Sequence, residues 1–320
     1  MTTTALQFDR VTKRFGTTEA VRDVSFAVEQ GEMFGLIGPD GAGKTTTIRV
    51  LCGLLRPTAG SVRVLGLDPV RQHHTITTKV GYFSQKFSLY GDLSIDENMA
   101  FFAEIHGVRH YRDRRNRLLD MMQLTPFRHR LADKLSGGMK QKLALACTLV
   151  HEPAVVLMDE PTTGVDPVSR REFWHLLSEF LAQGITILMS TPYLDEAERC
   201  SRVALMSEGH LLALDRPSLL RASFPGDIVE VIGEPQESAV SVLQTDAAVH
   251  DVQTFGERLH ARVARGQGST SLARFRTILH DAGIQVASIR DIPASLEDVF
   301  IDHVTSADNH DTRTPLDAHP

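Results

Sequence analysis

One eight-residue segment constrains this chain more than any other. It reads Gly-Pro-Asp-Gly-Ala-Gly-Lys-Thr over residues 38–45, between an apolar run at 33–37 and a run of helical character at 46–51. A strand, a glycine-rich loop and a helix in this order form a phosphate-binding P-loop, in which backbone N–H groups surround an anion and the helix N-terminus adds its positive end. We therefore expect an α/β fold with a P-loop nucleotide site, rather than a plain glycine turn.

The residues of this loop have separate predicted roles. The Lys44 ammonium would reach the β- and γ-phosphates of a bound nucleotide, and the Thr45 hydroxyl would hold Mg²⁺. The other nucleotide-binding positions predicted in and beside the loop are Gly38, Pro39, Asp40, Gly41, Ala42, Gly43 and Thr46.

Two adjacent carboxylates follow another apolar run. Residues 154–158 predict a buried strand that leads into Asp159 and Glu160. Carboxylates at a buried strand end are costly unless they have partners or a ligand. Asp159 would bind the Mg²⁺ shell through water, and Glu160 would orient and polarise the attacking water. Gln85, at the end of a strand predicted over 80–84, could complete the Mg²⁺ shell, although a surface glutamine is the plainer alternative.

A second anion site is predicted at the start of a helix that runs through Val150. Ser136, Gly137 and Gly138 would lie at its N-terminus, where free N–H groups and the helix dipole favour negative charge.

Phe15 has two possible places, since its ring could stack on an adenine or lie in the core.

Composition limits the classes of protein that remain. The formal net charge of −6 argues against nucleic acid as a partner, because phosphate neutralisation needs concentrated positive charge. The three cysteines are far apart and read as buried free thiols. Because no apolar run has the length of a membrane span and no signal peptide is evident, we expect a cytosolic chain whose membrane role, if any, requires a partner.

The length of 320 residues allows one large and one small domain. We expect the first over 1–216, with β-rich strands at its start and a helical insert at about 86–150. Within that insert the basic run 109–117 reads as a solvated helical face. Residues 217–305 show a βαββαβ order typical of a small ferredoxin-like α+β domain. The polar composition of 306–320 predicts a disordered tail.

Taken in order, these motifs resemble the nucleotide-binding subunit of an ATP-binding cassette (ABC) transporter. The P-loop, Gln85, the Leu-Ser-Gly-Gly segment from Leu135 and the carboxylates Asp159-Glu160 are followed by a D-loop that contains Asp166. The resemblance covers about 6–304 and implies an ABC ATPase domain with an antiparallel β-subdomain. It also implies catalytic roles for Lys44, Gln85 and Glu160.

The resemblance further implies partners. In the family, two subunits sandwich two ATP molecules head to tail, so that Ser136 and Gly138 of one subunit would contact the γ-phosphate held by Lys44 of the other. Segments 85–90, 194–198 and 294–300 are similar to those of drug-resistance-type exporters that pair with an ABC-2 type permease. Such a subunit would lie on the inner face of the cell membrane through its permease, as a homodimer or a heterodimer.

Two positions depart from the family pattern. Asp40 stands where asparagine is usual, and we expect its side chain to face away from the phosphates, which would repel it. Pro192 occupies the position of the switch histidine and has no side-chain donor and no N–H. Thr191 or water could substitute for the missing donor.

Two other functions remain possible. The chain could be a weakly hydrolysing ATP-binding switch that needs a second cassette, which Pro192 suggests and Glu160 opposes. It could also be a soluble cassette ATPase acting on ribosomes or DNA. The single cassette, the lack of a heptad run and the negative net charge argue against that function.

Overall fold

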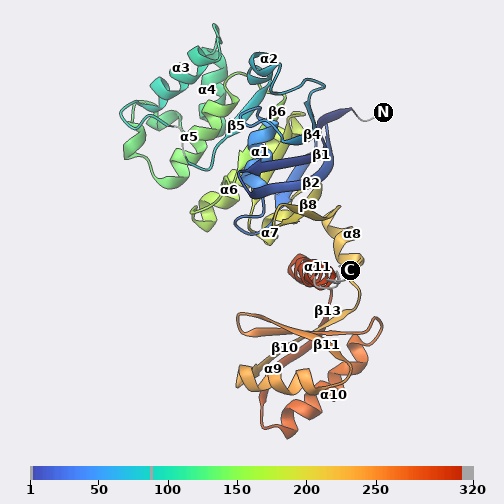
Figure 1. The fold of residues 1–320 in the computed structure, drawn as a ribbon. Coiled ribbons are helices and arrows are strands. Elements are labelled where there is room, and N and C mark those ends of the chain that lie inside the picture. Colours follow the sequence, from blue (N-terminus) through green and yellow to red (C-terminus); the bar gives the residue numbers. More distant parts are fainter. Residues whose placement is uncertain (1–2, 87–88, 312–320) are drawn as a thin grey trace, which may run out of the picture. The chain divides into compact units, whose positions relative to one another are not determined.

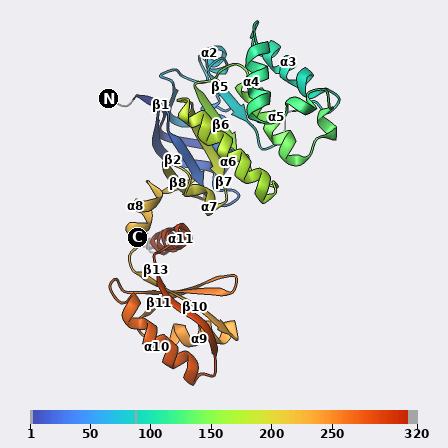
Figure 2. The same ribbon diagram turned by 180° about the vertical axis from the view of Figure 1, so that it is seen from behind.

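The computed structural model describes residues 3–86 and 89–311, with side chains up to residue 306. Figures 1 and 2 show it from two opposite sides. The chain divides into two compact units, residues 1–217 and residues from 218 onward, so the division falls one residue after the boundary expected from the sequence. Phe87 and Ser88, within the 85–90 segment used for the subgroup resemblance, lie outside the described residues.

The first unit begins with an antiparallel sheet of order β2-β1-β4. Strands β1 (Thr4–Phe15) and β2 (Thr18–Glu29) are much longer than the runs that predicted them, and β4 (Ala59–Val64) pairs with the other edge of β1. Buried and exposed positions alternate along much of β1 and β2, as in a sheet with one solvated face. The antiparallel β-subdomain is therefore present as predicted.

The second sheet of this unit carries the P-loop. Its order is β5-β6-β7-β3-β8-β9, in which the first five strands are parallel and β9 is an antiparallel edge. The strands are β3 (Met33–Ile37), β5 (Val80–Phe83), β6 (Val155–Asp159), β7 (Thr186–Thr191), β8 (Arg202–Ser207) and β9 (His210–Asp215). Because β3, β6 and β7 are parallel neighbours, their carboxyl ends meet at one edge of the sheet, where the predicted catalytic residues follow.

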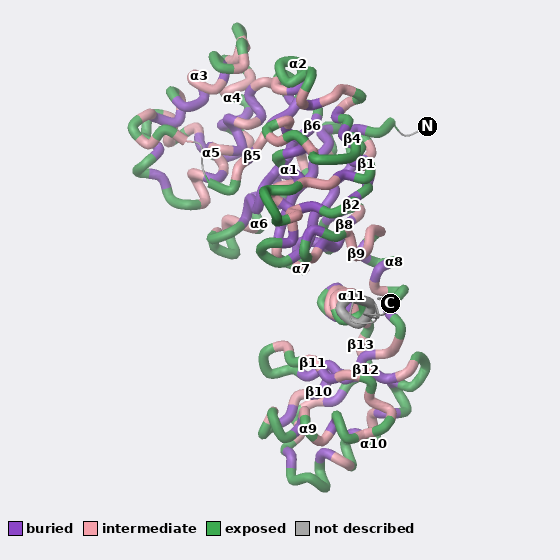
Figure 3. Tube along the Cα trace, in the orientation of Figure 1, coloured by how far each residue is buried: buried purple, intermediate pink, exposed green. Residues whose placement is uncertain are grey.

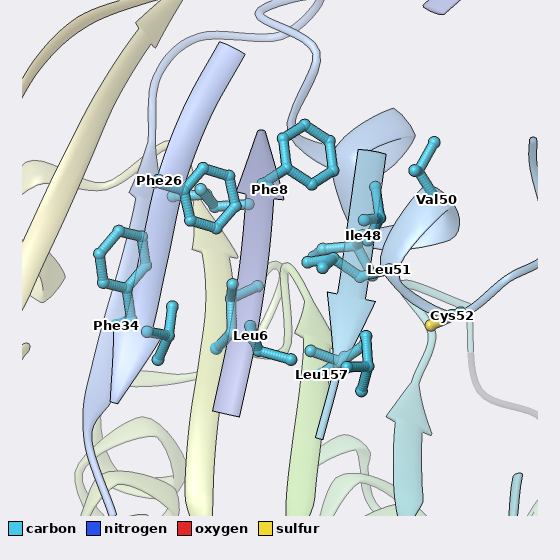
Figure 4. Close-up of a cluster of buried hydrophobic side chains, with 14 of the residues drawn as sticks. Leu6, Phe8, Phe26, Phe34, Ile48, Val50, Leu51, Cys52 and Leu157 are labelled. Carbon is cyan, nitrogen blue, oxygen red and sulfur yellow. The ribbon is translucent and has the colours of Figure 1, made fainter. Parts of the chain in front are cut away.

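One core joins the two sheets to the P-loop helix α1 (Lys44–Leu51). The rings of Phe8 and Phe26 stack at 5.0 Å between centroids, and those of Phe26 and Phe34 at 5.4 Å. Figure 4 shows these rings together with Ile48 of α1 and Leu157 of β6, and Figure 3 shows buried positions continuing through the sheets. Packing of α1 on this core fixes the loop that precedes it.

Helices of the insert lie together beside the parallel sheet (Figure 1). They are α3 (Ile95–Ile105), α4 (Arg112–Met121) and α5 (Gly137–Leu149), with 3-10 turns at Thr125–Phe127 and Ala132–Lys134. Short helices α2 (His73–Thr77) and α7 (Leu194–Ala197) and the longer α6 (Pro167–Ala182) complete the unit.

The prediction that the basic run 109–117 forms a solvated helical face is wrong in part. Helix α4 begins at Arg112, and two of its arginines are partly buried and have carboxylate partners. Arg115 lies 3.6 Å from Asp96, and Arg114 lies 3.4 Å from Glu152. These ion pairs attach α4 to its neighbours, so only part of the run faces solvent.

The second unit has the predicted βαββαβ order. It comprises β10 (Asp227–Glu234), α9 (Gln236–Thr245), β11 (Val249–Phe255), β12 (Arg258–Val263), α10 (Gly268–Asp281) and β13 (Gln285–Ile292), after the short α8 (Pro217–Ala222). The antiparallel sheet has the order β11-β12-β10-β13, with α9 and α10 packed on one face around a separate core, which is a ferredoxin-like arrangement.

The prediction of a disordered tail over 306–320 is wrong for its first residues. Helix α11 runs over Leu296–Asp311, so residues 306–311, which were expected to be disordered, are helical; residues 312–320 lie outside the described part of the chain. The helix is attached to the sheet where the Asp298 carboxylate lies 2.8 Å from His260 Nδ1.

All three cysteines are free and buried, as predicted. Burial raises the pKa of the Cys200 thiol to about 12 and also raises the pKa of the Cys52 and Cys147 thiols. Within residues 3–86 and 89–311, no helix combines the length and the apolar character that crossing a bilayer requires.

Candidate functional site

The backbone of the P-loop lies so close to neighbouring strands that two of its positions have room only for glycine. Gly43 has φ 98°, and a Cβ there would lie 2.4 Å from the carbonyl oxygen of Ala20. A Cβ on Gly38 would lie 2.1 Å from the carbonyl oxygen of Met206. Any other residue at these positions would displace the loop from β2 and β8, so both glycines are needed where the chain turns from β3 into α1.

Lys44 is buried at the centre of this loop. Its ammonium donates hydrogen bonds to the carbonyl oxygens of Gly38 (2.7 Å) and Pro39 (2.9 Å). The same nitrogen lies 3.4 Å from Glu160 Oε1, and both side chains are at most 7% exposed. The structure thus joins the predicted phosphate-binding lysine to the predicted catalytic carboxylate.

Asp159 is placed where a cation could be held. Its Oδ1 accepts from the hydroxyls of Thr45 (2.9 Å) and Ser190 (2.8 Å). Its Oδ2 is buried and has no hydrogen-bond partner in the part of the chain that the structure describes. An orphaned carboxylate oxygen beside a threonine hydroxyl fits the oxygen ligands that Mg²⁺ prefers.

Glu160 follows at the end of β6 with an unusual backbone conformation, φ 48°. Its N–H donates to Ser190, at 3.2 Å from the carbonyl oxygen and 3.1 Å from Oγ. Its carboxylate Oε2 accepts from Gln85 Nε2 at 2.9 Å and from the Thr163 hydroxyl at 3.4 Å. A left-handed backbone at a non-glycine residue persists only where its surroundings hold it, and here β7 supplies that support.

A cleft of about 390 Å³ lies over Lys44, Thr45 and Glu160, whereas the buried Asp159 does not line it. Phe15 is 49% exposed and lies on its wall, so this ring is not part of the core. Asp40 is exposed on the same wall. The residues that line the cleft are Phe15, Ala20, Asp40, Gly41, Ala42, Gly43, Lys44, Thr45, Thr46, Gln85 and Glu160.

The signature residues form a second group that does not line this cleft. Ser136 caps α5, and its hydroxyl accepts from the N–H of Met139 at 3.3 Å. Gly138 packs against α6, since a Cβ there would lie 2.3 Å from Ser169 Oγ. Asp166 caps α6 by accepting from the N–H groups of Val168 and Ser169.

Pro192 lies directly after β7 and is not among the residues lining the cleft. The preceding Thr191 is fully buried, and its hydroxyl accepts from the N–H of Tyr193 at 3.1 Å. The hydroxyl keeps its own proton when it accepts this bond, but Thr191 does not line the cleft, so its hydroxyl is not placed there as a substitute for the switch histidine.

Sequence reasoning missed two polar residues that support this site. Ser190 bridges Asp159 and the backbone of Glu160, and Glu196 is a buried carboxylate that accepts from Thr162. A serine at the end of an apolar strand was the available signal for the first. Nothing local pointed to the second.

Comparisons with known proteins identify the family. The sequence profile described as ABC transporter matches residues 21–163, from within β2 to just beyond Glu160. The Nod factor export ATP-binding protein I of Paraburkholderia xenovorans (strain LB400) is 38% identical over 305 residues, which cover 93% of this chain and 96% of that protein. The chain belongs to the ABC transporter family, as one of its ATPase cassettes.

Other relatives carry names of exporters. The daunorubicin resistance ATP-binding protein DrrA2 of Streptomyces coeruleorubidus is 35% identical, over 93% of this chain and 94% of that protein. The probable multidrug ABC transporter ATP-binding protein YbhF of Escherichia coli (strain K12) is 41% identical, over 93% of this chain and 51% of that protein. This chain therefore spans about half the length of the latter relative.

Solved structures agree with the fold of the cassette. The ATP-binding subunit of an ABC transporter has a TM-score of 0.63 and 30% identity, over 69% of this chain and 93% of that one. The bacterial ABC transporter cassette MJ0796, solved as a dimer and also in a dimeric post-hydrolysis state with ADP and Pi, has a TM-score of 0.59 and 25% identity over 66% of this chain and 98% of that one.

Proposed function

We propose that this chain is the ATP-binding and ATP-hydrolysing subunit of an ABC exporter, with its site at the P-loop cleft. The observation that carries the proposal is the cluster at the carboxyl ends of β3 and β6. There Lys44 and Gln85 both contact the carboxylate of Glu160, and one oxygen of Asp159 has no partner among the described residues. This combination supplies a cation for phosphate, a proton acceptor for water and an oxygen for a metal shell.

The residues present fit Mg²⁺, which Thr45, Asp159 and Gln85 would hold. Bound there, Mg²⁺ would neutralise charge on the phosphate oxygens. The buried Lys44 ammonium has two carbonyl partners and Glu160 in the structure. An incoming triphosphate is a stronger partner for an ammonium than a carbonyl oxygen. We infer that binding draws Lys44 towards the phosphates and frees Glu160 to accept a proton from the attacking water.

The site of one chain is incomplete without a second cassette. Ser136, Gly137 and Gly138 present a helix N-terminus, yet none of them lines the cleft of its own chain. We infer that these residues close over the γ-phosphate of a second subunit in a head-to-tail sandwich. The family resemblance and the dimeric relative support this arrangement.

A weakly hydrolysing switch subunit is the second candidate. Pro192 offers no donor, and the buried Thr191 does not line the cleft. The intact contacts of Glu160 favour hydrolysis over this alternative. We propose that Glu160 provides the main catalytic function without a switch side chain.

Export and the membrane partner are inferred from relatives. Several are named for export of Nod factors or for daunorubicin resistance. We propose that this chain pairs with permease subunits of the ABC-2 type and acts from the inner face of the cell membrane. We propose no nucleic-acid partner, because the net charge of −6 is unfavourable for binding phosphates.

The sandwich can be tested with a variant that binds ATP without hydrolysing it. We expect Glu160→Gln to form a dimer at saturating Mg-ATP, seen by light scattering as twice the monomer mass, because the trapped nucleotide joins two chains. Adding Ser136→Arg should abolish this dimer by filling the γ-phosphate site. Ser241→Arg, on the exposed face of α9, is the matched control. A monomer at saturating ATP, or a dimer indifferent to Ser136→Arg, would contradict the arrangement.

A further inference from the structure

A buried carboxylate lies outside the P-loop cleft and has no assigned role. Glu196, in the short helix α7, is 1% exposed. Its Oε1 alone accepts three hydrogen bonds, from the Thr162 hydroxyl (2.6 Å), Arg170 Nε (2.7 Å) and Trp174 Nε1 (3.3 Å). A carboxylate is expensive to bury without charged and polar partners, so these three donors are what make the position possible.

The three donors come from two segments that flank the site. Thr162 lies in the loop after β6, two residues beyond Glu160, whereas Arg170 and Trp174 belong to α6. Glu196 itself follows β7. Glu196 Oε1 therefore connects the loop after β6 with α6, and it does so from the segment after β7 that contains Pro192.

Glu160 is held from both sides by residues that follow or end β7. On its N-terminal side, Ser190 accepts the N–H of Glu160. On its C-terminal side, the next anchored side chain is Thr162, which donates to Glu196. Because Glu160 has φ 48°, the direction of its carboxylate depends on both anchors remaining in place.

The same network supports the segment around Pro192. The Arg170 guanidinium lies 4.9 Å from the ring centroid of Tyr193, the residue after Pro192. Arg170 also bonds to Asp195, but that carboxylate is 73% exposed and screened by solvent. The buried contact with Glu196 is therefore the one that fixes Arg170, and with it the position of this segment.

We propose that Glu196 is a positioning residue for ATP hydrolysis, which acts through Thr162 to hold the Glu160 carboxylate in its catalytic direction. In the absence of a switch histidine, this buried network connects the loops after β6 and β7. The inference rests on the proposed role of Glu160 as the proton acceptor.

The test removes one hydroxyl while keeping the shape of the side chain. We expect Thr162→Val to lower kcat about tenfold and to change the KM for Mg-ATP less than about twofold, because the P-loop contacts are untouched and one charge-assisted hydrogen bond is lost. Thr162→Ser restores the hydroxyl and should recover most of the wild-type kcat. Asp195→Ala, which removes only the exposed partner of Arg170, should leave kcat within about twofold.

A double-mutant cycle separates positioning from simple stabilisation. If Glu196 acts through Thr162, Glu196→Gln combined with Thr162→Val should lower kcat little more than the stronger single variant. The inference is overturned if Thr162→Val lowers the melting temperature but leaves kcat at the wild-type value, or if the two effects on kcat multiply. If Glu160→Gln also keeps the wild-type rate, the proposed role of Glu160 fails instead, so the two failures are distinguishable.

Discussion

Replacing Glu160 by glutamine is expected to lower the kcat for ATP hydrolysis by at least about 100-fold, since general-base catalysis contributes roughly 10²–10⁴-fold. The amide has nearly the shape of the carboxylate but cannot accept the proton of the attacking water. It can still accept from Gln85 Nε2, which lies 2.9 Å from Oε2 in the native chain. ATP binding should therefore survive, and the measurement is phosphate release under saturating Mg-ATP alongside equilibrium binding of ATP.

Glu152→Gln is the matched control for this variant. Its carboxylate is 64% exposed and lies on the loop before β6, where it pairs with Arg114. The wild-type rate is expected there. A Glu160→Gln chain that hydrolyses ATP as fast as the native one would show that another group accepts the proton.

Replacing Lys44 by alanine should weaken ATP binding by about 100-fold, because charge-assisted hydrogen bonds each contribute roughly 1.5–3 kcal/mol and tenfold corresponds to about 1.4 kcal/mol. Among the residues that the structure describes, Lys44 is the only lysine that lines the cleft. Calorimetric titration of ATP in the Glu160→Gln background measures the dissociation constant without turnover.

A second consequence of Lys44→Ala concerns the chain without nucleotide. Glu160 is buried and would lose its cationic partner 3.4 Å away, so the melting temperature should fall as well. Lys79→Ala, at an exposed position before β5, is the control that should change neither quantity. An unchanged dissociation constant for Lys44→Ala would contradict the proposed phosphate contact.

Local chemistry explains why much of the site could be predicted from the sequence. A P-loop is a continuous strand, loop and helix, so the spacing from Gly38 to Thr45 already contains its geometry. The same holds for the helix start predicted at Ser136, where the Ser136 hydroxyl caps α5 by accepting from the N–H of Met139.

Contacts between distant segments could not be predicted in this way. The bond from Thr162 to Glu196 joins residues 34 apart and depends on β6 lying beside β7. Strand order is not encoded in the pattern of one strand, so a buried glutamate in a short helix looked like any surface acid. The same limit applied to Arg115, whose partner Asp96 lies on another helix.

The end of the second unit was also predicted wrongly from composition alone. The polar residues after 305 predicted disorder, yet helix α11 continues to Asp311. Its first turn is anchored by Asp298, which accepts from Ser295 and contacts His260 on the sheet. A helix fixed at its start can extend through residues whose own composition gives no apolar face.

The most direct test of this account is steady-state Mg-ATP hydrolysis by the native chain beside Pro192→His. We predict clear turnover by the native chain and a change of less than about tenfold on adding the histidine, because Glu160, Lys44 and Asp159 already form a connected site and one further hydrogen bond is worth about 1 kcal/mol. Tight ATP binding with negligible native turnover, restored by Pro192→His, would contradict it and identify a degenerate site that depends on a partner cassette.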